Sequence, residues 1–539
     1  MASTGMDSLR LADGRPPPTP LANRLRQGVE TEPLVAADAV TRAGSMLDEH
    51  LRTVCGPENA VAPLLAALSS LRESVSSTVG APGAIQRILD GRGAEALVLR
   101  LRDEAASAVV RSEVAWVLAN MACGTSAQTA ALLEAGVAEA LFAALLSPAV
   151  GQRPELCDHC LWALGNIAGD CTAVRDRLLA AGVVGVLGQL YSGMPEMPWH
   201  QHFRTQVLRS LTWLMSGLCR GDPAPDLEEV DCCFDFFAQV LLGTEDRAML
   251  ADALWGLCYL LGGASGEEEQ QARGRRLLTA GFPAGEALPE RHPVLLRVVA
   301  CARAVIASEQ QPTFVPALRL LGQVAAMNAP ELTNAMLRAD GLRAIRRVLE
   351  DQRLPVQVQR DAAWSLQNIA AGTTEQAAAV AVDSATCNAL FDALSRAAPE
   401  VAFECAWAVV NLAKAGPQVL AQLGSRPWLR LATAALRAES RSGSLTGDSA
   451  GDDSSRLRRA LLEGCEVALR HCSGPKRAAA CEAGLLGELE DGNHGPTAPK
   501  AARMLQILNA DIENEFCGHS WNVSAPKARP LANGSKGGA

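Results

Sequence analysis

The sequence predicts an all-α protein built as a solenoid of stacked helical repeats. Hydrophobic residues make up 48 % of the chain but aromatic residues only 4 %, and this balance, rich in Ala and Leu, favours helices over strands. A chain of 539 residues is too long for one ordinary core, so it is either multidomain or repetitive. A segment centred on Trp recurs at intervals of about 45 residues, which indicates a repeat array.

The recurring segment contains a Trp with similar neighbours in six places. Successive Trp residues are 46, 51, 42, 109 and 43 residues apart, and the long interval divides at Arg319, which stands in the Trp position of a seventh copy. A helical repeat of roughly 40–47 residues is typical of armadillo or HEAT arrays. Such a repeat cannot bury its own apolar face, so stacked neighbours supply the core. The six residues are Trp116, Trp162, Trp213, Trp255, Trp364 and Trp407.

A second motif, Leu-Leu-x-Ala-Gly or a close variant, follows several of these segments. It occurs at 132–136, 178–182 and 336–341. We expect each copy to end a short helix, with its Gly in the left-handed conformation before the next helix.

Composition divides the chain into five segments. Residues 1–55 are polar and contain several prolines, which predicts a flexible arm, and 56–436 carry armadillo-like repeats 1–8. Residues 437–455 are rich in Ser, Gly and Asp, which predicts a disordered linker. Helical patterning resumes over 456–516 as two C-terminal capping repeats, and 517–539 are expected to form a disordered tail.

Charge and cysteine usage narrow the class of partner and the compartment. The formal net charge of −10 argues against nucleic acid or an anionic membrane as the main partner and suits a partner that is basic. The 16 Cys are scattered beside apolar residues, as expected for buried thiols in a reducing compartment. We find no signal peptide and no membrane-spanning run, so we expect a soluble intracellular protein.

On a helix at 100° per residue, each Trp segment separates into two faces. Positions two before, two after and five after the Trp are apolar in every copy, which predicts the core face. Four Trp are followed by Asn at the fourth position, and four are preceded by an acid at the third, so these polar groups share the opposite face with the Trp. The predicted core positions are Val114, Leu118, Met121, Cys160, Leu164, Ile167, Leu211, Met215, Leu218, Ala253, Leu257, Leu260, Ala362, Leu366, Ile369, Cys405, Val409 and Leu412.

The polar face has the chemistry of a peptide-binding surface. A single Trp in a helix is usually a core residue, but six in one phase, opposite a separate core face, indicate a ladder. Neighbouring indoles can hold the methylene stems of Lys or Arg, and carboxylates can take the charged heads. Asn can bond to the main chain of an extended peptide without reading its side chains. The ligand predicted is an extended, Lys/Arg-rich peptide.

These runs resemble the importin-α family of nuclear import receptors. Residues 116–128, 162–170, 208–213 and 251–259 resemble the family's second to fifth repeats, and the segments of the last two Trp fall in its seventh and eighth. The resemblance implies a right-handed superhelical solenoid of about ten armadillo repeats. It also implies a receptor for nuclear localisation signals of cargo proteins that moves between cytoplasm and nucleus, with importin-β and a recycling exportin as partners.

The resemblance implies two peptide sites on the Trp-bearing face. The major site would comprise Trp116, Asn120, Trp162, Asn166, Asp170, Trp213, Asp252, Trp255 and Tyr259. The minor site would comprise Arg319, Asp361, Trp364, Asn368, Glu404, Trp407 and Asn411.

Several positions depart from the family pattern. Gly217 and Gln323 stand where the fourth and sixth repeats have Asn, Gly262 replaces an Asp of the fifth, and His159 stands where Gln is usual. Residues 1–55 hold six Arg, no Lys and seven acids, whereas the family begins with a strongly basic segment that binds importin-β. We therefore expect residues 1–55 to compete little with a peptide ligand for the Trp-bearing face.

Two alternative interpretations remain open. The sequence Cys157-Asp158-His159-Cys160 could be half of a zinc site, although no matching second pair follows. An armadillo scaffold of a cytoskeletal or signalling complex would share the fold without needing the Asn ladder. We find no phosphate loop, dinucleotide fingerprint or nucleophile elbow, and we predict no enzyme and no cofactor.

Overall fold

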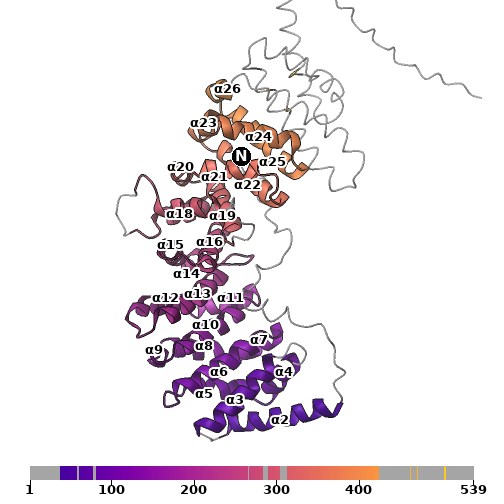
Figure 1. Cartoon of the computed structure of the whole chain (residues 1–539), viewed down its shortest axis with the longest axis vertical. Helices are drawn as coiled ribbons and strands as arrows, with labels where there is room; N and C mark the ends of the chain where they lie inside the picture. Colours follow the sequence, from indigo (N-terminus) through magenta and orange to yellow (C-terminus); the bar gives the residue numbers. More distant parts are fainter. Residues whose placement is uncertain are drawn as a thin grey trace, which may run out of the picture. The chain divides into compact units, whose positions relative to one another are not determined.

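The computed structural model describes residues 37–56, 60–76, 81–264, 266–282, 289–303 and 312–423, together with residues 462, 466, 470, 503 and 504. This part of the chain consists of helices and their connections and contains no strand, so the predicted all-α fold is confirmed. The helices divide into two compact units, within Met1–Ala287 (unit 1) and Leu288–Ala539 (unit 2) (Figure 1).

In unit 1, α3 and the four Trp-bearing helices that follow it stack one on the next. The order is α3, α6, α10, α13 and α16, while α5, α8 and α12 form a second layer of successive contacts. The helices are α2 (Ala37–Cys55), α3 (Val61–Ser76), α4 (Ala81–Asp90), α5 (Gly93–Arg102), α6 (Ala108–Met121), α7 (Ser126–Glu134), α8 (Val137–Leu145), α9 (Ala149–Gln152), α10 (Pro154–Ala168), α11 (Thr172–Ala180), α12 (Val183–Gly193), the 3₁₀ helix η2 (Met194–Glu196), α13 (Gln201–Leu218), α14 (Leu227–Val230), α15 (Cys233–Gly243), α16 (Arg247–Gly262) and α17 (Glu267–Thr279).

Unit 2 repeats this arrangement. Here α19, α22 and α25 stack in order, and α18, α21 and α24 form the second layer. The helices are α18 (Pro293–Arg303), α19 (Phe314–Ala326), α20 (Pro330–Arg338), α21 (Gly341–Glu350), α22 (Val356–Ala371), α23 (Thr374–Val382), α24 (Ser384–Arg396), α25 (Pro399–Lys414) and α26 (Pro417–Leu423).

The predicted core face is confirmed in both units. All eighteen predicted core positions, from Val114 to Leu412, have side chains with at most 2 % exposure. The helices that carry these residues pack on the helices of neighbouring repeats, so apolar burial between repeats is the main force that holds each stack together.

Local signals fix where several helices begin. Thr125 caps α7 and Thr373 caps α23, each in a capping box with a Gln three residues later. Asp246 caps α16 by accepting hydrogen bonds from the backbone N–H groups of Ala248 and Met249. These caps satisfy backbone donors that have no partner in the first helical turn.

The short-helix motif behaves as expected in two of its three copies. Gly136 and Gly182 both adopt the left-handed conformation, each with φ of 81°. In the third copy, the prediction for Gly341 is wrong, because the preceding Asp340 takes that conformation with φ of 70°. Asp tolerates left-handed geometry better than most side chains. Gly341 instead begins α21, where a Cβ would lie only 2.7 Å from Cγ of Met336.

Helix α2 occupies 37–55, within the segment that the composition assigns to the arm, and packs on α3. The rest of that arm lies outside the described residues, as do the linker and the tail. Of the predicted capping repeats, only five isolated residues are described. Within the described ranges, no single helix is both long and apolar enough to cross a membrane, although three bent helix pairs satisfy the length and composition test together.

Candidate functional site

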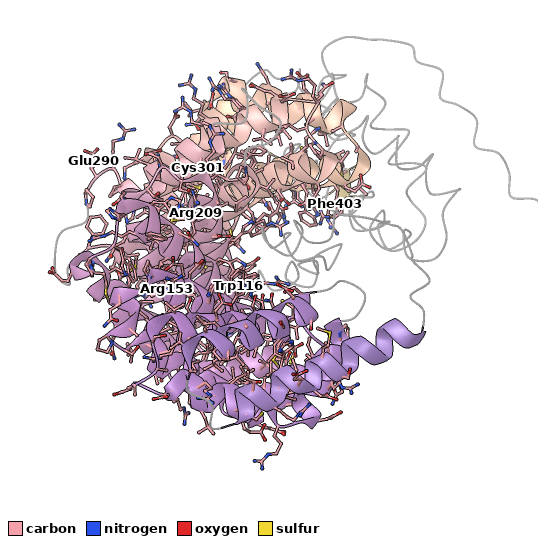
Figure 2. All side chains as sticks on the ribbon, turned by 60° about the horizontal axis from the view of Figure 1, so that its bottom comes forward. Trp116, Arg153, Arg209, Glu290, Cys301 and Phe403 are labelled. Atoms are coloured by element: carbon pink, nitrogen blue, oxygen red, sulfur yellow. The ribbon has the colours of Figure 1, made fainter. Side chains whose placement is uncertain are left out.

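Within each unit, the Trp side chains lie on one face of the stacked helices, which we call the ladder face of that unit. The two ladder faces comprise the Trp of α6, α10, α13, α16, α22 and α25, together with the Asn four residues later and the acid three residues earlier where the sequence has them. Arg319 on α19 and Asp170 after α10 also belong to them. All six Trp are half-buried, in contrast to the fully buried core positions. Figure 2 labels Trp116 on α6 and Arg209 on α13, two helices of this stack.

Glycines on the preceding helix provide room for two of the indoles. A Cβ added to Gly165 of α10 would lie 2.0 Å from the six-membered ring of Trp213, and one added to Gly322 of α19 would lie 2.6 Å from that of Trp364. Both glycines stand three residues after the Trp position of their own repeat. These close approaches place the two indoles directly against the neighbouring repeat.

The ladder asparagines bond in three different ways. Asn166 donates from Nδ2 to the carbonyl of Ala119 at 3.0 Å, and Asn411 to that of Gln367 at 3.1 Å, so each links its helix to the preceding one. Asn368 instead donates to the Trp364 carbonyl of its own helix, at 3.0 Å.

The fourth, Asn120, is buried, and its Nδ2 has no hydrogen-bond partner among the described residues. No hydrogen bond to Oδ1 of Asn166 is present there either. These amides therefore keep capacity for a ligand main chain, although sequence reasoning missed that two of them also join repeats.

Three positions interrupt the ladder of amides. A Cβ at Gly217 would meet nothing within 4 Å, so no other side chain replaces the missing Asn of α13. Gln323 on α19 is buried, and its Oε1 has no partner. Gly262 is an exposed residue at the end of α16.

Unit 1 contains two carboxylates with unused capacity. Asp170 accepts a hydrogen bond from Ser126 Oγ at 2.8 Å through one oxygen, whereas its other oxygen is buried without a partner. Asp252 has no hydrogen bond or ion pair with any described residue. Burial, with a smaller contribution from the charge of Asp246, raises the pKa of Asp252 to about 7. A desolvated carboxyl without a counter-charge is a site that gains from an incoming cation.

The arginine nearest in register to Asp252 is bound elsewhere. Arg209 on α13 donates from Nε to Asp246 at 2.8 Å and also pairs with it through Nη2. Burial acts to raise the pKa of Asp246, but the bonds from Arg209 and from the helix backbone outweigh it and lower the pKa overall.

In unit 2, the corresponding acids already have arginine partners. Arg319 lies 3.3 Å from Asp361, and Arg360 lies 3.5 Å from Glu404. Burial still raises the pKa of Glu404, with Arg360 acting against that shift. The residues predicted for the minor site thus share one face, but their charges are compensated inside the protein.

Arg72 on α3 was missed by the sequence analysis. Its Nε lies 3.3 Å from Glu113, and its guanidinium carbon lies 4.0 Å from the centroid of the Trp116 ring. It stands 44 residues before Trp116. The Trp pattern does not identify it, because the positions two before and two after Arg72 are Ser70 and Ser74, which are half-buried and polar rather than buried and apolar.

Two further features bear on the alternatives. The first concerns the possible half zinc site at 157–160. Cys157 and Cys160 are fully buried, and burial raises the pKa of both thiols, whereas His159 stacks on Trp116. In the described ranges, no His, Cys, Asp and Glu side chains group as metal ligands do.

The second feature is a cavity of about 640 Å³ between α12, α13 and α15. Tyr191, Arg204 and Phe236 are among its lining residues, and it includes no ladder-face residue.

The chain is similar to importin α subunits, although no protein-family model matches it. It is 36 % identical to importin subunit alpha-1b of Oryza sativa subsp. japonica over 153 residues, which are 28 % of this chain and 26 % of that protein. Identity to importin subunit alpha-2 of Caenorhabditis elegans is 29 % over 307 residues, or 57 % of this chain and 50 % of the relative. The matches thus span from about a quarter to a half of these relatives.

Among solved structures, an engineered protein superposes with a TM-score of 0.65 at 20 % identity, covering 87 % of this chain and 98 % of that one. At this identity the likeness concerns the fold alone. Together with the named relatives, it supports an importin-α-like armadillo protein.

Proposed function

We propose that the ladder face of unit 1 binds an extended, Lys/Arg-rich peptide, and that the protein is a nuclear import receptor for cargo carrying such signals. The observation that carries this proposal concerns two carboxylates on the same face as four half-buried Trp. Among the described residues, one oxygen of Asp170 has no hydrogen-bond partner, and the desolvated Asp252 has no counter-charge. The net charge of −10 and the similarity to proteins named importin subunit alpha point in the same direction.

Each kind of ladder residue has a role in this proposal. The indoles of Trp162, Trp213 and Trp255 hold the methylene stems of basic side chains, with Tyr259 stacked beside Trp255 at a centroid distance of 5.9 Å. Asp170 and Asp252 accept the charged heads, and Asn166 accepts a main-chain N–H of the peptide.

The face of unit 2 is proposed as a second, weaker site. Its residues match the minor site implied by the resemblance, but a ligand cation there must compete with Arg319 and Arg360 for the same carboxylates. Importin-β, a recycling exportin and passage between cytoplasm and nucleus are proposed from the similarity to the named relatives.

The proposal is tested by fluorescence anisotropy on the full chain. The probes are a labelled peptide with three consecutive Lys and the same peptide with Ala in their place. We expect binding of the Lys peptide only, and a loss of about tenfold or more on Asp170→Asn, because one charge-assisted hydrogen bond contributes about 1.5–3 kcal/mol.

The matched control is Glu95→Gln, which removes one negative charge on helix α5 of the second layer. Its affinity should equal that of the unchanged protein. Equal binding of the Lys and Ala peptides would reject the receptor and favour the scaffold interpretation.

A further inference from the structure

The indole of Trp116 is covered on two sides by the protein's own side chains. The Arg72 guanidinium carbon lies 4.0 Å from the indole centroid, and the imidazole of His159 stacks on the indole at 4.7 Å with an interplanar angle of 26°. Arg72 comes from α3 and His159 from α10, which pack on α6 from the preceding and the following repeat (Figure 1). The two groups therefore approach the indole from opposite sides.

Both covering groups are held in place by further bonds. Arg72 donates from Nε to Glu113 at 3.3 Å and from Nη2 to Ser69 Oγ at 3.1 Å, and its side chain is only 22 % exposed. His159 Nδ1 lies 3.0 Å from the carbonyl oxygen of Ser112. Because a carbonyl oxygen only accepts, Nδ1 carries the hydrogen.

The imidazole does not repel Arg72 at neutral pH. Burial lowers the pKa of His159, against the hydrogen bond to the Ser112 carbonyl and the charges of nearby acids, Asp158 among them. The ring is then neutral, and a neutral ring beside an indole and a guanidinium forms a stable aromatic and cation–π stack.

The next ladder Trp in unit 1 differ from Trp116. Trp162 and Trp213 have no aromatic or cationic partner among the described residues, and the close neighbour of Trp213 is Gly165. Neither indole is covered by a described ring or guanidinium that a basic side chain would have to displace. At Trp116 a basic side chain must displace Arg72 or His159. The contact energy that the ligand gains there is offset by the contact energy that the protein loses.

We infer that Arg72 and His159 close the first slot of the ladder, so that the peptide proposed above as ligand needs only a short basic run, read from Trp162 onwards. This inference rests on the proposed function and defines its ligand class more narrowly. Arg72 acts as a built-in competitor that also neutralises Glu113, and His159 fills the space between Trp116 and the following repeat.

The test compares two labelled peptides of equal length, with three and with five consecutive Lys in an otherwise neutral sequence. The unchanged protein should bind both within about twofold. The double variant Arg72→Gln with His159→Ala opens the slot and releases Glu113, so it should prefer the five-Lys peptide by about tenfold, with the three-Lys affinity unchanged. Arg153→Gln, at the start of α10 and paired with Glu155, is the matched control and should leave the ratio unchanged.

A second measurement does not depend on the double variant folding. Trp116→Leu should change three-Lys affinity by less than about twofold, whereas Trp162→Leu should lower it by tenfold or more. A fivefold preference of the unchanged protein for five Lys, an unchanged ratio in the folded double variant, or equal losses on the two Trp substitutions would overturn the inference alone. Absence of binding by both peptides would instead reject the proposed function, and the inference with it.

Discussion

The ladder faces of the two units begin alike and then diverge. Each begins with an Arg that pairs with the acid of the next repeat, Arg72 with Glu113 in unit 1 and Arg319 with Asp361 in unit 2. In unit 2 the following acid, Glu404, is paired again, with Arg360. In unit 1 the later acids of the ladder face, Asp170 and Asp252, have no cation partner among the described residues.

This difference shows that matching residue types do not make equivalent sites. A paired carboxylate has already recovered its lost hydration through the arginine, and an incoming cation gains only the difference between two similar partners. An unpaired, partly buried carboxylate gains the whole interaction. We therefore expect most of the affinity for basic peptides in unit 1.

The largest expected effect comes from charge reversal in unit 1. Asp170→Lys should lower the affinity for the three-Lys peptide by roughly 10- to 150-fold, because it removes an acceptor for about 1.5–3 kcal/mol of charge-assisted bonding and adds repulsion. Glu404→Lys in unit 2 should change it by less than about threefold. Calorimetry on both variants measures the contrast, and similar losses would mean that the units contribute equally.

Peptide affinity should also depend on pH through Asp252. Its pKa of about 7 means that the carboxyl must lose its proton to accept a cation, so affinity rises with pH and levels off above 8. We expect a gain of about tenfold between pH 6 and pH 8. Asp252→Asn should flatten this profile, and a steep profile that persists in the variant would assign the titration to another group.

A smaller effect is expected from freeing the acid of unit 2. Arg360→Gln leaves Glu404 without its cation, so a bipartite peptide with two basic clusters should bind about threefold more tightly to this variant than to the unchanged protein. Arg353→Gln removes an exposed arginine paired with Asp351 and is the matched control. No gain in the Arg360 variant would show that the internal pair does not limit the second site.

The smallest effect concerns stability. Because the folded state raises the pKa of Asp252 above that of an unfolded Asp, it holds the proton more tightly, and stability present at low pH is lost as pH rises towards 7. Asp252→Asn should therefore increase the free energy of unfolding at pH 8 by about 1–2 kcal/mol. Glu404→Gln should not, because it leaves Arg360 without its partner; urea denaturation of both variants measures this.

The sequence was sufficient to predict the fold and the two faces of each Trp helix. It was insufficient to predict which acids of the ladder faces are paired with arginines. The eighteen core positions follow from periodicity alone, since every copy repeats the same three apolar offsets. Glu404 and Arg360 lie 44 residues apart, on two different helices. Whether their side chains extend far enough to meet is not specified by periodicity. The same holds for Asn166, whose bond to Ala119 crosses to the preceding repeat. The predicted peptide sites themselves stay predictions.

The glycine beneath Trp213 makes the repeats an ordered series. Position 165 must lack a side chain because of the indole that follows it, not because of its own repeat. A repeat moved to another place in the array would keep its own Trp but would be separated from the glycine of the preceding repeat that makes room for the indole. Shuffled or shortened versions of this protein should therefore keep each of these Trp helices together with the glycine-bearing helix that precedes it.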